Sequence, residues 1–435
     1  MPARPNKRYC GAVMEASIGP AVGYGALLRT NKAYRRLWLG AIVSLAGDWF
    51  TTVALFSMLL EFTGRAESVG FALIARFLPA ALFGPLAGVV ADRLPRKKVM
   101  IACDLLRVFV VLGFILVKDR SDVGLVYLLT FVQLTLSAFF DPAEQAAIGA
   151  VTTPEEVVTA NTIHAATWSA MLSLGAMAGG LVTAYFGRTT AFVIDAFSFA
   201  ASAILISRAA IPAIVHRPAD RKRWTTLLGI DDLLEGLALL QRERRLRGLL
   251  MAKAGWGLAG GGAFLLYAVF GERVFTTGGS AATGIGVLYG ARGLGALLGP
   301  VLARRYGGDG EAWLQRAIGL SFFLAIGGYA SFAFAPNVWV GMIALAVVHL
   351  GVSTIWVFSN ALVNLWVPDA MRGRVFAADM TVFTLMLIGS SYVTGFALDV
   401  WGLDPRLMMA ILALSQVLPA IAWRLSQRRT LAVAT

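Results

Sequence analysis

Residues 84–98 read GPLAGVVADRLPRKK, and this stretch decides the fold. Gly84 and Gly88 stand four apart, so they share one face of a helix and allow a neighbouring helix to approach closely. The apolar run then stops at Asp92, and four cations follow within six residues. These features indicate a membrane-spanning helix that ends in a short basic loop.

The cations also predict the side of the membrane on which this loop lies. They are Arg93, Arg96, Lys97 and Lys98. Loops rich in Lys and Arg stay in the cytoplasm. Pro95 fixes its own backbone and keeps the turn tight. Charge alone would equally fit an ordinary solvated loop, so the rest of the chain has to decide.

The composition is that of a polytopic membrane protein. Of the 435 residues, 58% are hydrophobic and 14% are charged, and the mean hydropathy is +0.71. Soluble chains carry about 25% charged residues. The net charge of +13 does not indicate a nucleic-acid partner, because the cations alternate between connections instead of gathering on one soluble domain. Their distribution predicts that both termini are cytoplasmic.

Twelve windows are long and apolar enough to span a membrane, which takes roughly 20 residues each. They lie at 37–60, 69–91, 99–117, 123–140, 161–185, 189–207, 248–270, 283–303, 313–335, 338–360, 376–398 and 405–425. The predicted domains are a cytoplasmic basic tail at 1–36, a six-helix bundle at 37–208, a cytoplasmic central loop at 209–247, a second six-helix bundle at 248–425 and a tail at 426–435. In the central loop, residues 227–240 could form an amphipathic helix on the inner membrane surface, or a solvated linker.

The two halves look like copies of one another. Arg76 precedes Gly84 and Pro85 in the second span, as Arg292 precedes Gly299 and a proline in the eighth. Repeats of this kind mark transporters in which two bundles rock around a central site.

Residues 84–98 resemble the signature loop between helices 2 and 3 of the major facilitator superfamily, except that Pro95 stands where the family usually has glycine. Residues 139–161 and 365–376 are similar to loops of its exporter branch, which includes enterobactin-exporter-like and macrolide-efflux proteins. The resemblance runs from 37 to 425. It implies an all-α fold of twelve transmembrane helices in two pseudo-symmetric bundles.

The resemblance also implies a gate on the cytoplasmic side. Asp92 is expected to pair with the start of helix 11, at 374–379, and Arg96 is expected to reach Asp141 at the end of helix 4. These contacts would hold the cytoplasmic side shut and break as it opens. The other gate residues are Gly84, Gly88, Arg93, Lys97, Arg372 and Arg374.

Gly175, Gly179 and Gly180 belong to the segment GAMAGG in the fifth span. The segment resembles a glycine-rich motif of drug and proton antiporters in the superfamily, with Ala176 in place of proline. Small residues at such spacing also occur in any close helix pair, so helix packing is the second interpretation.

Motifs for catalysis are missing from the sequence. It has no G-x-x-x-x-G-K-[ST] loop, so it is not expected to hydrolyse ATP. His164, His216 and His349 have no metal-ligand spacing, and the two cysteines, Cys10 and Cys103, make no thiolate site. We therefore expect no enzymatic activity, metal or cofactor.

Ionisable side chains inside a span are expensive, so each is a candidate for function. Asp48 lies halfway along the first span and is either the proton-coupling site or a structural hydrogen-bond acceptor. Asp195, in the sixth span, is expected to make a structural pair. Asp104 and Arg107 stand three apart in the third span and are expected to satisfy one another.

Three further cations lie inside spans without a partner close in sequence: Arg76, Lys253 and Arg292. If they face one cavity, they favour an anionic cargo. His349, in the tenth span, could take part in coupling or simply be hydrogen-bonded. The candidates for stacking on an aromatic ligand are Trp49, Trp168, Trp256 and Trp356, which could equally fill space or anchor the helices at the membrane interface.

Together these features predict a secondary active transporter of a bacterial-type inner membrane. By alternating access, it would export a small amphipathic or anionic molecule, such as a siderophore or drug, in exchange for protons. A lysophospholipid or other lipid carrier is the alternative within the class, and a non-transporting scaffold or sensor is the alternative outside it. The expected partners are the substrate, protons and the lipid bilayer, for a chain that acts as a monomer.

We expect Asp92→Asn to bias the protein toward the conformation that is open to the cytoplasm, because the substitution removes the charge of the predicted gate contact. Thiol labelling of cysteines introduced on the cytoplasmic side of the cavity should then become faster. Unchanged labelling would count against this gate.

Overall fold

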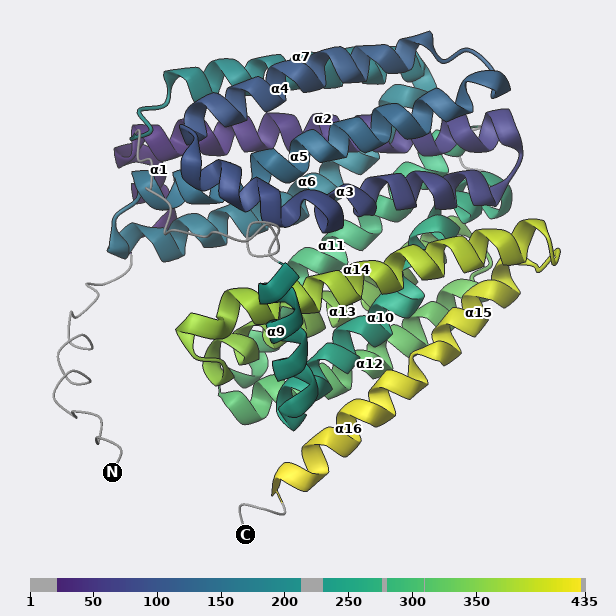
Figure 1. The fold of residues 1–435 in the computed structure, drawn as a ribbon. Helices are drawn as coiled ribbons and strands as arrows, with labels where there is room; N and C mark the ends of the chain where they lie inside the picture. Colours follow the sequence, from purple (N-terminus) through teal and green to yellow (C-terminus); the bar gives the residue numbers. More distant parts are fainter. Residues whose placement is uncertain (1–21, 213–229, 276–279, 309, 432–435) are drawn as a thin grey trace, which may run out of the picture.

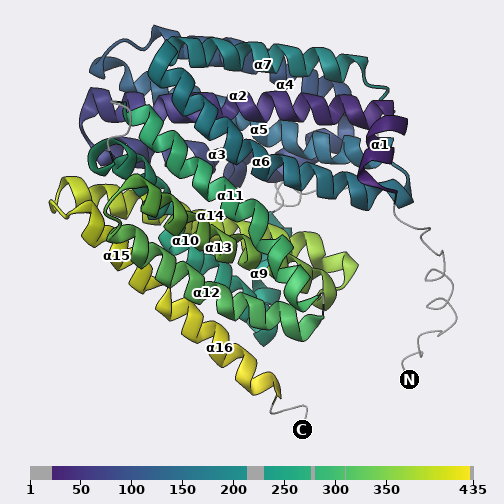
Figure 2. The same cartoon turned by 180° about the vertical axis from the view of Figure 1, so that it is seen from behind.

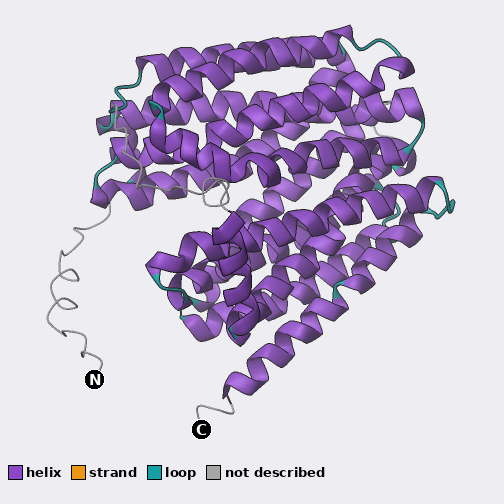
Figure 3. Cartoon of the chain, in the orientation of Figure 1, coloured by secondary structure: helices purple, strands orange, loops and turns teal. Residues whose placement is uncertain are grey.

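The computed structural model describes residues 22–212, 230–275, 280–308 and 310–431. Twelve helices in this part of the chain are long and apolar enough to cross a membrane, which confirms the predicted number. The described residues form helices and connecting turns without a strand, as Figure 3 shows, so the all-α prediction is also confirmed.

The first six spans follow the short helix α1 (Tyr24–Thr30) and are α2 (Lys32–Thr63), α3 (Ala66–Arg93), α4 (Arg96–Gly113), α5 (Val123–Val151), α6 (Pro154–Phe186) and α7 (Arg188–Arg208). Two 3-10 turns, η1 (Phe114–Leu116) and η2 (Arg120–Asp122), lie between α4 and α5. The second six spans follow α9 (Ile230–Arg242) and are α10 (Arg244–Val269) with the π-helical turn η3 (Phe270–Val274), α11 (Ala281–Gly307), α12 (Glu311–Ala333), α13 (Val338–Trp366), α14 (Asp369–Asp399) and a divided helix, α15 (Pro405–Ser415) with α16 (Val417–Leu431).

The spans pack into two halves (Figure 1). In the first half α2 packs against α6 and α7, and α4 packs against α5 and α7. In the second half α10 packs against α14, and α13 packs against α11 and α12. Figure 2 shows α6 and α11 running side by side where the halves meet. We call the end of the molecule that carries α1, α9 and the last turns of α16 the terminal end. The sequence predicts that it faces the cytoplasm.

Glycines bring the two halves into close contact along α6 and α11. A Cβ atom on Gly180 would lie 2.6 Å from the carbonyl oxygen of Ala282, and one on Gly286 would lie 2.7 Å from that of Ala176. A side chain at either position would collide with backbone, so the helices approach as closely as glycine permits.

The other two motif glycines of α6 face α2, within the first half. A Cβ atom on Gly175 would lie 3.2 Å from the Cβ of Trp49, and one on Gly179 would lie 2.7 Å from the Cα of Phe50. α6 therefore uses this glycine-rich turn to pack closely on two helices at once.

Hydrogen bonds between the halves close the end opposite the terminal end. Asp399, the last residue of α14, accepts from the N–H groups of Ala66 (3.1 Å) and Glu67 (2.6 Å) in the first turn of α3. A carboxylate of the second half therefore caps a helix of the first, where the positive end of the helix dipole favours its charge. The Nη2 of Arg273 adds a hydrogen bond to the carbonyl oxygen of Gly64, at 2.7 Å.

The halves diverge toward the terminal end (Figure 1). No atom of another helix lies within 4 Å of a Cβ placed on Gly84 or Gly88 in α3, or on Gly373 in α14. The close helix approach predicted at Gly84 and Gly88 is therefore absent, because the second half stands away from α3 at this end.

α5 is longer than the sequence predicts. The apolar pattern indicates an end at Phe140 and a loop that begins with Asp141, but the helix continues to Val151 with Pro142 in its interior. A proline in a membrane helix removes one backbone hydrogen bond without ending the helix when neighbouring groups satisfy the freed carbonyl. Asp141 therefore lies within a helix and not at its end.

The twelfth span, predicted as one helix, is divided near its middle. The N–H group of Gln416 bonds the carbonyl oxygen of Ala413 at 3.2 Å and closes α15. Pro419 has no N–H group for the carbonyl of Ser415, four residues earlier, so the α-helical ladder is interrupted there. α16 continues along the flank of the second half (Figure 1).

The amphipathic helix predicted at 227–240 is present from Ile230 as α9, and residues 227–229 lie outside the described residues. α9 packs on α14. Leu240 is buried, Gly236 leaves room for the backbone of Arg374, and Glu235 pairs with Arg374 at 2.8 Å. α9 is thus attached to the terminal end of the second half and is not a solvated linker.

We expect Gly286→Ala to destabilise the protein by about 1–3 kcal/mol, the usual cost of overpacking, because the new Cβ would collide with the backbone of α6. The thermal midpoint of the purified protein in detergent should fall. Gly149→Ala is the matched control, since nothing lies within 4 Å of its Cβ position. Equal midpoints for the two variants would contradict the close contact of α6 and α11.

Candidate functional site

Asp48 lies in the middle of α2, half-buried, with polar partners from two other helices. Its Oδ1 accepts a hydrogen bond of 3.1 Å from the Nε2 of Gln133 in α5. Its carbonyl oxygen accepts from the Oγ1 of Thr52 (2.6 Å), which in turn accepts from the Nη1 of Arg76 in α3 (3.1 Å). Asp48 forms no ion pair with any described residue. Its carboxylate is thus hydrogen-bonded, and Arg107 and Arg76 interact with it electrostatically without forming an ion pair.

Two arginines at equivalent positions of the repeat flank a pair of aromatic rings at the boundary between the halves. Trp49 of α2 and Tyr289 of α11 have ring centroids 5.8 Å apart. The guanidinium of Arg76 lies 5.6 Å from the centroid of Trp49, and that of Arg292 lies 5.7 Å from Tyr289 and 4.0 Å from Phe264. Cations over aromatic faces are held by the negative potential of the ring. Both arginines are therefore positioned without an anionic partner among the described residues.

Lys253 corrects one expectation drawn from the sequence. It is buried and forms an ion pair with Asp379 of α14, and its Nζ donates a hydrogen bond of 2.6 Å to the Oδ1 of Asn360 in α13. The three intramembrane cations therefore do not form an unpaired trio. Of the three cations, Arg76 and Arg292 are the two that form no ion pair with a described residue.

Asp104 and Arg107 of α4 lie together, with 3.7 Å between Oδ1 and Nη2, and both are buried. The guanidinium also lies 4.4 Å from the ring of Phe140 and 4.9 Å from that of Phe199. The predicted pair is therefore embedded between two aromatic rings and faces the inside of the first half.

The sequence missed a second titratable pair. The Oε2 of Glu144 in α5 lies 3.7 Å from the Nε2 of His164 in α6, and Glu144 is buried. Glu144 stands one helical turn after Asp141. The only signal in the sequence was the spacing of Asp141 and Glu144, which places both on one face of a helix. That signal could not be used while Asp141 was predicted to begin a loop.

Asp195 makes the structural contacts expected of it. Its Oδ2 accepts from the Oγ1 of Thr51 at 2.6 Å, and its Oδ1 accepts from the Oγ of Ser198 at 3.1 Å. It is fully buried between α7 and α2. A Cβ on Gly47 would collide with both Asp195 and Ser198, so this glycine makes room for the contact.

His349 has a hydrogen-bonding partner in the core of the second half. Its Nε2 lies 3.0 Å from the hydroxyl oxygen of Tyr267, which lies 3.4 Å from that of Tyr329. All three side chains are buried. This contact favours the hydrogen-bonded interpretation, and a role in coupling stays a prediction.

The two candidate tryptophans of the second half, Trp256 and Trp356, pack against one aromatic ring. Trp256 stacks on Phe383, with centroids 5.3 Å apart and planes at 14°, and Trp356 packs on the same ring at 5.0 Å. The Nζ of Lys253 lies 4.9 Å from the ring of Trp356. Trp168 of α6, by contrast, is exposed.

The contacts around Arg96 differ from those predicted. Arg96 donates from Nη1 to the carbonyl oxygen of Ala146, 2.9 Å away, while Asp141 is exposed. The reason is the extra length of α5, whose later turns face the start of α4. Lys97 likewise donates to a carbonyl, that of Ala209, at 2.9 Å.

Arg374, in the segment expected to face Asp92, and Arg372, another predicted gate residue, have partners among the described residues. Arg374 pairs with Glu235 of α9, and the Nε of Arg372 donates to the carbonyl oxygen of Val367 at 3.1 Å. The side chain of Asp92 lies outside the described residues, so its pairing stays a prediction. No group of three or more potential metal ligands occurs within the described ranges.

Removing either partner of the Lys253–Asp379 pair should destabilise the protein strongly, by about 3–5 kcal/mol, because the other charge would stay buried and unpaired. We expect Lys253→Met and Asp379→Leu each to lower the thermal midpoint. The double variant should recover most of the loss. Additive losses in this double-mutant cycle would mean that the two side chains do not depend on one another.

Comparison with curated proteins finds transporters of similar sequence. The chain is 26% identical over 236 residues to an uncharacterized transporter of the major facilitator type, YkuC of Bacillus subtilis, covering 53% of this chain and 55% of YkuC. It is 23% identical to the putative bacilysin exporter BacE of Bacillus subtilis, covering 84% of this chain and 88% of BacE. It is 28% identical to macrolide efflux protein A of Streptococcus pyogenes, over 49% of this chain and 53% of that protein. The chain thus spans about half the length of the first and third of these relatives.

Solved structures share the fold. The nucleoside transporter NupG superposes with a TM-score of 0.68 at 18% identity, over 91% of this chain and 99% of NupG. The peptide-transporter-family protein PepTSo superposes with a TM-score of 0.70 at 12% identity, over 92% of this chain and 98% of PepTSo. The family model of the Major Facilitator Superfamily matches residues 37–327. The chain therefore belongs to the major facilitator superfamily.

Proposed function

We propose that this transporter exports a small amphipathic molecule with an anionic group, in exchange for protons, by alternating access. One arrangement carries the proposal. The carboxylate of Asp48 lies halfway along α2 without an ion pair, and Arg76 interacts with it electrostatically. Arg292 of the other half lies across the Trp49–Tyr289 ring pair.

Asp48 is the proposed proton site. A charged carboxylate halfway through a membrane is expensive, so a change of solvation moves it readily between its charged and neutral forms. Its one side-chain partner, the amide of Gln133, can stay in contact with either form. A donor group of the substrate and a proton would compete for the same carboxylate oxygen atoms of Asp48. Binding of one would then require release of the other, which couples substrate movement to proton movement.

The two arginines are the proposed anion site. A guanidinium presents several N–H donors in a fixed plane and binds carboxylate or phosphate-like groups well. Arg76 and Arg292 come from different halves, and the rings of Trp49, Tyr289 and Phe264 beside them offer apolar surface. An amphipathic anion fits both features. The pairing of Lys253 with Asp379 removes the third cation from this site.

The direction of transport rests on the shape of the molecule and on its relatives. The contacts between the halves close the end opposite the terminal end, and the terminal end is where α3 stands away from the second half. If the terminal end faces the cytoplasm, as the positive-inside pattern predicts, cargo would be loaded from the cytoplasm. Relatives named as macrolide efflux protein and putative bacilysin exporter support export.

Transport in proteoliposomes with an imposed pH gradient tests the proposal. Candidate siderophores, drugs and lysolipids are screened first, each acid beside its neutral ester. We expect the gradient to accelerate movement of the acid several-fold over the ester, and Asp48→Asn to remove that acceleration while exchange without a gradient persists.

Asp48→Glu, which keeps the carboxyl group, should retain part of the acceleration. Asp119→Asn is the control, because Asp119 lies in an exposed turn outside the spans. Full acceleration in Asp48→Asn would eliminate Asp48 as the coupling site. Faster movement of the neutral esters would contradict an anionic cargo.

A further inference from the structure

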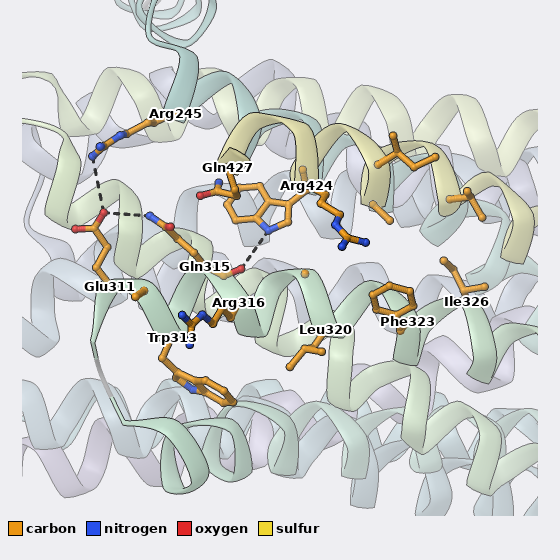
Figure 4. A pocket seen from close by; sticks show the side chains of 16 residues that line it. Arg245, Glu311, Trp313, Gln315, Arg316, Leu320, Phe323, Ile326, Arg424 and Gln427 are labelled. Atoms are coloured by element: carbon orange, nitrogen blue, oxygen red, sulfur yellow. Dashed lines mark hydrogen bonds and ion pairs between the residues drawn. The ribbon is translucent and has the colours of Figure 1, made fainter. Parts of the chain in front are cut away.

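A long groove lies on the flank of the second half, away from the boundary with the first (Figure 4). It runs between α12 and α16 and has a volume of about 1220 Å³. α12 packs on α13, α15 and α16, all within the second half. The groove therefore faces outward, toward the bilayer, and is separate from the proposed transport site.

The groove lies beside the second part of the twelfth span. α15 and α16 continue in one line along the flank of the second half (Figure 1), and both contact α12. The Nε1 of Trp423 donates to the carbonyl oxygen of Gln315 at 3.1 Å and holds α16 to α12 near the terminal end. Gly319, opposite Trp423, adds no side chain to fill the space between the two helices.

The floor of the groove is apolar and exposed. Leu320 and Phe323 of α12 are 54% and 64% exposed, and Val417 and Ile421 of α16 are 37% and 51% exposed. At this depth of a spanning helix there is no water to cover such a surface, and acyl chains are the material that fills it.

The mouth of the groove at the terminal end is basic. Arg316 of α12 and Arg424 of α16 line it from opposite sides, and both are exposed (Figure 4). Neither forms an ion pair with a described residue.

Glu311 is the one carboxylate among the described residues that line the groove, and its Oε1 has other partners. This atom accepts hydrogen bonds of 3.0 Å from the Nε2 of Gln315 and from the Nε1 of Trp366, and lies 3.8 Å from the Nη1 of Arg245. Glu311 forms no ion pair with Arg316 or Arg424.

We propose that this groove is a binding site for one anionic phospholipid of the leaflet at the terminal end. The phosphate would lie between Arg316 and Arg424, and an acyl chain would lie over Phe323 and Ile421. Guanidinium groups bind phosphate oxygens in a bidentate manner, so two of them on opposite walls favour an anionic head group over a zwitterionic one. A bound lipid would hold α16 against α12 along the groove.

Native mass spectrometry of the full-length protein, purified and then incubated with phosphatidylglycerol or phosphatidylcholine, tests the site. We expect one phosphatidylglycerol molecule to be retained at detergent conditions that strip phosphatidylcholine. In the double variant Arg316→Gln/Arg424→Gln, affinity should fall about 25-fold, from roughly fivefold for each juxtamembrane cation.

Two matched variants complete the experiment. Arg29→Gln/Arg208→Gln removes the same charge from exposed arginines outside the groove and should retain the lipid like the unchanged protein. Arg316→Lys/Arg424→Lys keeps the charge and should retain it in part. Equal retention of phosphatidylglycerol and phosphatidylcholine by the unchanged protein would overturn the proposal. So would unchanged retention by the Arg316→Gln/Arg424→Gln variant, or an equal loss in the Arg29→Gln/Arg208→Gln control.

Discussion

The architecture depends on one steric constraint, the contact of α6 with α11 through glycine. Lipid chains are as apolar as the helices themselves, so helices in a membrane associate by close packing more than by the hydrophobic effect. Gly180 and Gly286 let the two backbones meet, while Gly175 and Gly179 hold α6 against α2 on its other side. α2 and α11 are thereby brought within ring contact, through Trp49 and Tyr289. The two arginines beside these rings owe their proximity to the same glycines.

The sequence predicts well the features that depend on residues close together in the chain. Twelve apolar windows fix the number of spans, and Asp104 and Arg107, three apart on one helix, lie 3.7 Å from one another without a hydrogen bond between them. The predicted end of α5 was wrong because Asp141 and Pro142 look like the start of a loop. A membrane helix tolerates a proline when neighbouring groups satisfy the freed carbonyl. Because of that error, Glu144 was not recognised as a residue of the same helix.

Contacts between side chains of helices that are far apart in the sequence cannot be predicted from spacing along the chain. Lys253 and Asp379 are 126 positions apart, and only the packing of α10 on α14 brings them together. The repeat singled out Arg76 and Arg292, which lie beside the same pair of rings at the boundary between the two bundles. The repeat gave no reason to distinguish these two arginines from Lys253, whose charge is neutralised by Asp379. Both halves therefore hold a buried ion pair, Asp104–Arg107 in the first and Lys253–Asp379 in the second.

The cap that Asp399 places on α3 bears on how easily the closed end can open. When the halves separate there, the N–H groups of Ala66 and Glu67 would be exposed to water, which accepts the hydrogen bonds that the carboxylate gives up. Each exchange would then cost only about 1 kcal/mol, the net value of a protein hydrogen bond, and not the several kcal/mol of a buried polar group left unpaired. In the proposed transport cycle, such a closure would be reversible. A cap of this strength would keep the closed arrangement populated and leave the opening step within reach of the binding energy of a small cargo.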